Sequence, residues 1–220
     1  MSGSRPYERR RTRPVAVLVA VLAVCAAVTW TVVFTNTDRP AADDCPAPPA
    51  APLPGEVLAA DALDAVPPVA PALARVTVLN AGGQRGQANL VAAQLADLGF
   101  AQAAPPANDP LFPNGGLECR GQLRFGPAGE GPAATLALVL PCTELVRDGR
   151  GDDAVDVVVG TGFGDVTPSS TVTDALEDLA APGGGTDGSG NTADADPAAA
   201  PPLPGPDADT RVEIRDAAGC

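Results

Sequence analysis

The stretch 75-RVTVLNAGGQRGQANLVAAQLADLGF-100 decides the expected fold. Its first six residues, 75–80, are rich in β-branched and large apolar side chains and predict a strand, and the glycine-rich run 81–86 predicts a turn. Apolar residues at helical spacing then predict a helix over 87–98, with Gly99 as its C-terminal stop. A short return strand is expected at 100–101, which completes a strand–helix–strand unit.

Similar segments extend this unit along the chain. The sequence predicts a strand over 117–126, a helix over 127–140 and, after a polar connection, a β-branched strand over 155–160. The order β-α-β-β-α-β predicts a small α/β (α+β) domain with one sheet and helices on one face. A further amphipathic helix is expected over 171–180, whereas 210–215 alternates only weakly between apolar and polar residues.

An uncharged run of 20 residues, 15–34, precedes the domain. A helix of this length spans about 30 Å, the thickness of a bilayer core. Five arginines stand just before the run, so the positive-inside rule predicts a single-pass protein of the cell membrane with a cytoplasmic N-terminus and an extracytoplasmic domain. A cleaved signal peptide is the alternative, but no convincing small-x-small site follows the run. A lipoprotein signal at Cys25 is disfavoured because valine precedes this cysteine.

The composition of each segment divides the chain into six parts. These are a cytoplasmic basic tail over 1–14, a transmembrane helix over 15–34, a proline-rich stalk over 35–74, the extracytoplasmic domain over 75–180, a flexible linker over 181–206 and a C-terminal segment over 207–220. Because proline dominates the stalk, it is expected to be extended and semi-rigid, with at most a helical turn near 57–63. Glycine, proline and aspartate dominate the linker.

The composition disfavours several kinds of chemistry. The chain has no histidine and no lysine, so it lacks the usual general base, the commonest metal ligand and the lysine of a Walker-type phosphate site. The net charge is −13, and such an acidic chain repels nucleic acid. We therefore expect neither enzyme activity nor a cofactor nor a metal. A hydrolase with paired carboxylates is the alternative, although nothing in the sequence selects a pair.

Four of the five cysteines lie after the uncharged run: Cys45, Cys119, Cys142 and Cys220. An even number in an oxidising compartment predicts disulfides. From Cys119, a strand of about 23 Å followed by an antiparallel helix of about 20 Å would bring Cys142 back beside it. We therefore expect the pairs Cys119–Cys142 and, with the remaining two, Cys45–Cys220.

The glycine-rich turn is also the candidate binding site. Asn80, Gly82, Gly83 and Arg85 stand where a strand leads into a helix, and backbone amides at a helix N-terminus can bind an anionic or sugar ligand. Arg124 on the next long strand is expected to be a neighbour. The GxGxxG spacing of dinucleotide sites is absent. The alternative is a turn whose glycines serve only its backbone conformation.

Three stretches, 76–100, LRFGPAGEGPAATLALVLP (123–141) and VDVVVGTGF (155–163), resemble the LytR C-terminal domain family. The resemblance implies an extracytoplasmic module that often follows LytR-CpsA-Psr phosphotransferase domains, which attach glycopolymers to peptidoglycan. Such a catalytic domain is not recognised in this sequence. Further motifs are similar to those of actinobacterial envelope integrity proteins, namely GFAQ (99–102), NDP (108–110), QLRFG (122–126) after Cys119, and PCTEL (141–145).

These resemblances imply a non-enzymatic role in cell envelope integrity. We expect a membrane-anchored, extracytoplasmic binding or scaffold protein whose partner is cell-wall glycan or an envelope protein. The alternative is an accessory subunit that acts in trans with a LytR-CpsA-Psr glycopolymer transferase.

Overall fold

The computed structural model describes residues 16–24, 26, 45–49, 51–181 and 205–220. It has two units, Met1–Ala41 and Ala42–Cys220. In the first unit, the described residues 16–24 and 26 are helical and exposed. Among the described residues, no helix has both the length and the apolar character of a membrane span. The predicted tail over 1–14, half of the predicted transmembrane helix over 15–34 and most of the predicted linker over 181–206 lie outside the described residues.

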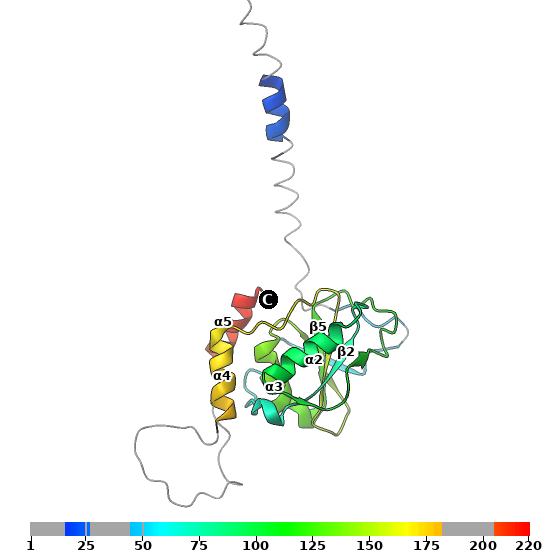
Figure 1. Ribbon diagram of the computed structural model, residues 1–220, viewed down its shortest axis with the longest axis vertical. Coiled ribbons are helices and arrows are strands. Elements are labelled where there is room, and N and C mark those ends of the chain that lie inside the picture. Colours follow the sequence, from blue (N-terminus) through cyan, green and yellow to red (C-terminus); the bar gives the residue numbers. More distant parts are fainter. Residues whose placement is uncertain (1–15, 25, 27–44, 50, 182–204) are drawn as a thin grey trace, which may run out of the picture. The chain divides into compact units, whose positions relative to one another are not determined.

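The second unit is built on one mixed sheet of seven strands (Figure 1). The strands lie in the order β1-β6-β5-β7-β2-β3, and β4 also pairs with β2. Their bounds are Gly55–Leu58 (β1), Arg75–Asn80 (β2), Ala101–Gln102 (β3), Ala107–Asn108 (β4), Gly121–Phe125 (β5), Glu144–Asp148 (β6) and Val155–Val159 (β7). β2 is parallel to β3, β4 and β7, whereas β5 is parallel to β6 and antiparallel to β7. β1 completes one edge, antiparallel to β6.

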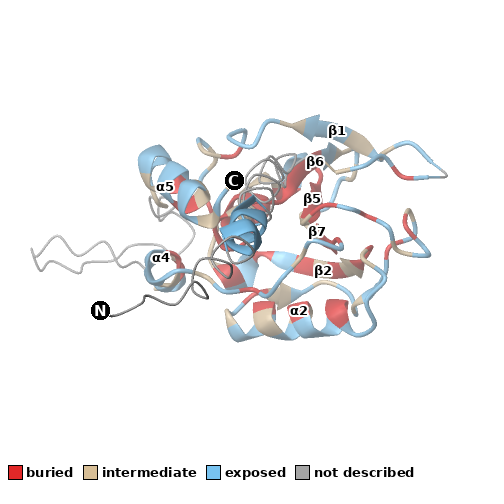
Figure 2. Cartoon of the chain, turned by 90° about the horizontal axis from the view of Figure 1, so that it is seen from above, coloured by how far each residue is buried: buried red, intermediate tan, exposed pale blue. Residues whose placement is uncertain are grey.

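The helices of this unit cover one face of the sheet. They are α2 (Gln87–Asp97), α3 (Glu130–Val139), α4 (Ser170–Ala180) and α5 (Ala208–Ala218), with short 3₁₀ turns η2 (Pro71–Leu73) and η3 (Pro127–Gly129). α2 connects β2 to the parallel β3, and α3 connects β5 to the parallel β6, as crossover connections require. Residues of all four helices belong to the same core. Figure 2 shows buried residues on α2 and α5. The predicted class, one sheet with helices, is confirmed.

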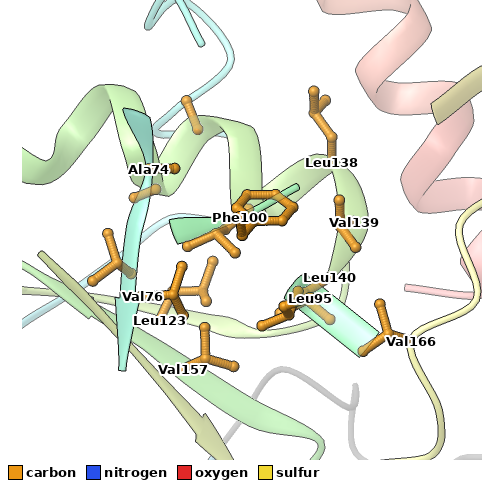
Figure 3. Packing of buried hydrophobic residues seen from close by; sticks show 14 of the residues in the cluster. Ala74, Val76, Leu95, Phe100, Leu123, Leu138, Val139, Leu140, Val157 and Val166 are labelled. Carbon is orange, nitrogen blue, oxygen red and sulfur yellow. The ribbon is translucent and has the colours of Figure 1, made fainter. Parts of the chain in front are cut away.

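Alternation along the strands separates two apolar clusters. On β7, Val155, Val157 and Val159 join the main core under the helices, while Val158 joins a smaller cluster on the opposite face. Figure 3 shows Leu123 and Val157 of the sheet close to the helical side chains of the main core. The smaller cluster contains Ala81, Phe112, Leu117, Cys119 and Val158. The second face of the sheet is therefore covered by loops.

Local signals set the ends of the helices. α2 follows Gly86 and is followed by Gly99, which have φ values of 78° and 87°, respectively, conformations that favour glycine. The Ser169 side chain accepts a hydrogen bond from Val172 N at 3.3 Å and caps α4. Asp207 caps α5 in the same way. Such caps stabilise a helix by about 1 kcal/mol.

Several predicted boundaries are wrong. The connection after α3, for which no strand was predicted, contains β6. A strand is tolerated there because Glu144, Arg147 and Asp148 each have a partner within the fold. The segment 45–74 is not an extended stalk, since β1 pairs with β6 along its whole length and turns follow it. The weak alternation over 210–215 lies within α5, where Arg211 and Ile214 form a buried face.

Candidate functional site

Asn80, at the end of β2, organises the glycine-rich turn. Its Oδ1 accepts hydrogen bonds from Gly82 N at 3.2 Å and Gly83 N at 3.1 Å, and its Nδ2 donates to Gln84 O at 2.7 Å. The side chain is buried. Both polar atoms of the Asn80 amide are therefore engaged in holding the turn.

The glycines of the turn allow close packing against neighbouring loops. A Cβ on Gly82 would lie 2.8 Å from Gly160 O, and one on Gly115 would lie 2.8 Å from the Cα of Gly83. Gly83 also has a φ of 80°, which side chains rarely adopt. The turn is thus fixed between the loop after β7 and the loop before β5.

Arg85 is the exposed cation of this turn. Within the described residues, its guanidinium has no hydrogen-bond or ion-pair partner. The first turn of α2 has no side-chain cap, because its N-cap is Gly86. Of the predicted turn residues, Arg85 is therefore the one whose side chain is free to meet a ligand.

Arg124, the remaining predicted ligand contact, lies inside the molecule on β5. It is 3% exposed, and its Nη1 lies 2.9 Å from Asp109 Oδ2, in a carboxylate that is fully buried. Its Nε and Nη2 donate to Gln122 Oε1 at 2.9 and 2.7 Å. Burial lowers the pKa of the Arg124 guanidinium, and the nearby Asp109 carboxylate partly offsets this effect. Arg124 does not stand at the surface beside the turn.

This ion pair belongs to a buried polar network on the loop-covered face of the sheet. Gln122 Nε2 donates to Glu144 Oε2 at 2.5 Å, and Glu144 Oε1 accepts from Cys45 N at 3.3 Å. Asp109 N donates to Asn80 O at 2.9 Å, which links the network to the glycine-rich turn. The network therefore joins β2, β5, β6 and two loops, a structural role for Arg124.

A second ion cluster lies near the ends of β6 and β7. Arg150 Nη2 is 2.7 Å from both Asp148 Oδ2 and Asp156 Oδ2. Burial would lower the pKa of Arg150, but the hydrogen bonds that it donates to these carboxylates raise it overall. Burial would raise the pKa of Asp148, but the Arg150 hydrogen bonds lower it overall. Arg150 therefore links the end of β6 to β7 through both carboxylates.

All four outer cysteines form disulfides, but the predicted pairing is wrong. The bonds are Cys45–Cys119 and Cys142–Cys220. Cys119 packs in the cluster on the loop-covered face, whereas Cys142 follows a helix on the other face and lies beside α5. The estimate of strand and helix lengths placed both cysteines at one end of the sheet, but it could not distinguish the two faces.

The structure also reveals a hollow that the sequence did not predict. It has a volume of about 480 Å³ and lies between the end of α3, the loop after β7 and the end of α5. Its lining includes Arg120, Phe163, Asp165 and Thr167. The Arg120 guanidinium, like that of Arg85, has no partner among the described residues. In the sequence, Arg120 had no distinguishing signal beyond its place after Cys119.

A metal centre finds no support in the described part of the chain. No group of three or more cysteine, aspartate or glutamate side chains there could hold an ion. The candidate ligand contacts are the side chains of Arg85 at the turn and of Arg120, Phe163, Asp165 and Thr167 at the hollow.

Comparison with known proteins identifies the class of this domain. Residues 74–163 match the LytR_C family, described as LytR cell envelope-related transcriptional attenuator. The chain belongs to this family, as its motifs predicted. It is also 43% identical over 181 residues to the cell envelope integrity protein Cei of Mycobacterium tuberculosis (strain ATCC 25618 / H37Rv), a match that covers 80% of this chain and 83% of that relative. The resemblance to actinobacterial envelope integrity proteins is thereby confirmed.

A solved structure is similar to the second unit. It is the crystal structure of the soluble domain of a conserved hypothetical secreted protein from Mycobacterium marinum. The TM-score is 0.59 at 37% sequence identity, and the match covers 74% of this chain and 97% of that one. Together with the disulfides, these relatives support an extracytoplasmic, envelope-associated protein.

Proposed function

We propose that this chain is a membrane-anchored, extracytoplasmic binding or scaffold protein that contributes to the integrity of the cell envelope without catalysing a reaction. The supporting observation is that two arginines lack a partner inside the fold while the others are paired. Arg85 and Arg120 have no internal partner among the described residues, whereas the other arginines that the structure describes are bound within the fold: Arg75, Arg124, Arg147, Arg150, Arg211 and Arg215. In an acidic domain, two free cations suit contacts with an outside partner.

The rigidity of the domain favours a binding role over a catalytic one. Two disulfides hold its loops, and its fully buried carboxylate, Asp109, is paired with Arg124. The Arg150 hydrogen bonds lower the pKa of the Asp148 carboxyl, whereas a general acid needs a raised pKa. The release of soluble fragments from purified wall tests this point. The proposal would be overturned if the wild-type chain released soluble fragments from the wall and Asp148→Asn or Asp156→Asn abolished this release.

Binding is tested by sedimentation of the full chain with purified cell wall, in parallel with capture from a membrane-protein extract. Retention on the wall identifies glycan as the partner, and recovery of one defined envelope protein identifies a scaffold role. Arg85→Ala is expected to weaken the interaction, while Arg75→Ala, an exposed arginine already paired with Asp153, serves as the matched control. Retention of neither partner by the wild-type chain would refute a binding role.

The anchor is supported by the uncharged run 15–34 behind the arginine cluster. A reporter that is active only outside the cytoplasm, fused after Cys220, is expected to be active. Deletion of 15–34 should abolish this activity or release the protein from the membrane fraction. A reporter that is active only in the cytoplasm would contradict the topology.

The second candidate is an accessory subunit that acts in trans with a LytR-CpsA-Psr glycopolymer transferase. The family match over 74–163 favours it, because the family bears the name LytR. Co-purification of such an enzyme with the full chain after cross-linking on intact cells would select this alternative, and its absence from the cross-linked products would reject it.

A further inference from the structure

The hollow beside α5 has walls that are fixed before any ligand arrives. The loop after β7 is held at its start, where Gly160 N donates to Arg120 O at 3.0 Å and Gly162 N donates to Cys119 O at 2.9 Å. At its end, Val166 N donates to Gln94 Oε1 at 3.3 Å. A preformed site avoids the entropic cost of ordering a loop on binding.

The opposite wall, α5, is held as firmly. The disulfide between Cys142 and Cys220 ties its end to the residues after α3. Arg211 is buried and donates to Leu63 O at 3.0 Å and Val66 O at 3.1 Å. Arg215 forms a bidentate pair with Asp64 at 2.7 and 2.8 Å. The hollow is therefore a part of the fold and does not depend on one loose segment.

The groups that line the hollow combine opposite charges, a hydroxyl and an aromatic ring. Arg120 is partly exposed and unpaired among the described residues, and Asp165 and Thr167 are exposed. Phe163 packs partly against the main core and leaves part of its ring accessible. Gly162 and Gly164 flank Phe163 and add no side chain beside it. The volume of about 480 Å³ is within the range of small-molecule sites, roughly 300–1,000 Å³.

We propose that this hollow binds an uncharged sugar ring of an envelope glycan, an inference that rests on the proposed binding function. A sugar ring has apolar C–H faces that pack on an aromatic ring. The hydroxyl groups around the ring form hydrogen bonds with guanidinium and carboxylate groups. Arg120 donates to sugar oxygens, and Asp165 accepts from sugar hydroxyls. An anion is disfavoured because Asp165 balances Arg120 and the chain as a whole carries −13.

The test uses the full chain in detergent and three probes: neutral oligosaccharides from wall polysaccharide, oligomers of N-acetylglucosamine, and inorganic phosphate. Titration calorimetry gives the affinities, and amide shifts of Gly162 and Gly164 in NMR spectra locate the site. One of the two saccharide probes is expected to bind and to shift these amides. Arg120→Ala and Asp165→Asn should each weaken binding by about tenfold or more, since charged hydrogen bonds are lost. Arg75→Ala, which removes an exposed arginine already paired with Asp153, is the matched control and should bind as the wild type does.

The outcomes separate this site from the proposed function. Arg120 and Asp165 are not buried, so their variants should keep the native circular dichroism spectrum, which is checked first. Unchanged affinity in both variants, amide shifts elsewhere, or binding of phosphate alone would overturn the sugar site. If the wild-type chain is retained on purified wall while neither saccharide binds, the hollow is refuted and the binding function stands. If the wild-type chain has no partner at all, the proposed function itself fails.

Discussion

Replacement of Arg124 by methionine tests the buried network most directly. Methionine keeps an unbranched apolar stem but removes the charge and every donor. The fully buried Asp109 carboxylate would lose its ion pair, and Gln122 Oε1 would lose two hydrogen bonds. Removing one partner of a buried pair costs about 3–5 kcal/mol. In a domain of this size, each kcal/mol shifts Tm by about 2–4 °C, so we expect a fall of about 6–20 °C.

The assay is urea and thermal unfolding of the oxidised protein, followed by far-ultraviolet circular dichroism. The matched control is Arg75→Met, which breaks a pair whose side chains are 52% and 48% exposed and should cost less than about 1 kcal/mol. The double variant Arg124→Met with Asp109→Leu should recover much of the loss, because no buried charge then remains unpaired. Equal loss of free energy of unfolding in Arg124→Met and Arg75→Met would refute the reasoning.

Three further predictions follow from the same structure. Replacing Cys142 and Cys220 together with serine should lower the free energy of unfolding by about 2–4 kcal/mol and expose α5 to limited proteolysis, whereas unchanged protease resistance would contradict the role given to this bond. Gly115→Ala should cost more than Gly116→Ala in urea unfolding, because both glycines have positive φ but only the first would bring a Cβ to 2.8 Å from neighbouring backbone; equal losses would argue against the close contact. Because Arg150 lowers the Asp148 pKa, its carboxylate contributes stability above its ordinary pKa of 3.8 that is lost as pH falls through the lowered value. Asp148→Asn should flatten the pH dependence of Tm in that acidic range, and an unchanged profile would exclude this contribution.

The central unit of the fold could be predicted because its signals are local. Periodicity and glycine stops define β2 and α2, and β-branched residues define β7. The sequence of β6, ELVRD, hid its strand, since three of its five residues are charged. Two of those charges have partners far along the chain, Glu144 with Gln122 and Arg147 with Glu130, whereas Asp148 pairs with the nearby Arg150. A one-dimensional pattern does not show that a charged residue is satisfied across a sheet.

The candidate site was also predicted only in part, because sequence patterns show local structure and do not show contacts between distant segments. The turn after β2 lies where expected, but the amide of Asn80 is engaged with local backbone groups, a detail that depends on the conformation of Gln84. Arg124 was predicted to contact a ligand, but it pairs with Asp109 inside the fold. The motif NDP (108–110) pointed to the family and did not show which residue Asp109 contacts. Arg120 and the hollow were missed because three separate segments form that site only in the folded chain.

The bond between Cys45 and Cys119 also determines how the domain would bear mechanical tension. If the chain is held in a membrane before Cys45 and a wall polymer pulls on Arg120, force passes through this covalent bond to the residue next to Arg120. The 73 residues between the two cysteines, which include β1, β2 and α2, would stay outside the loaded path. Pulling in that direction would load the disulfide and would not peel strands from the sheet, so the attachment would resist force without relying on the packing of the core.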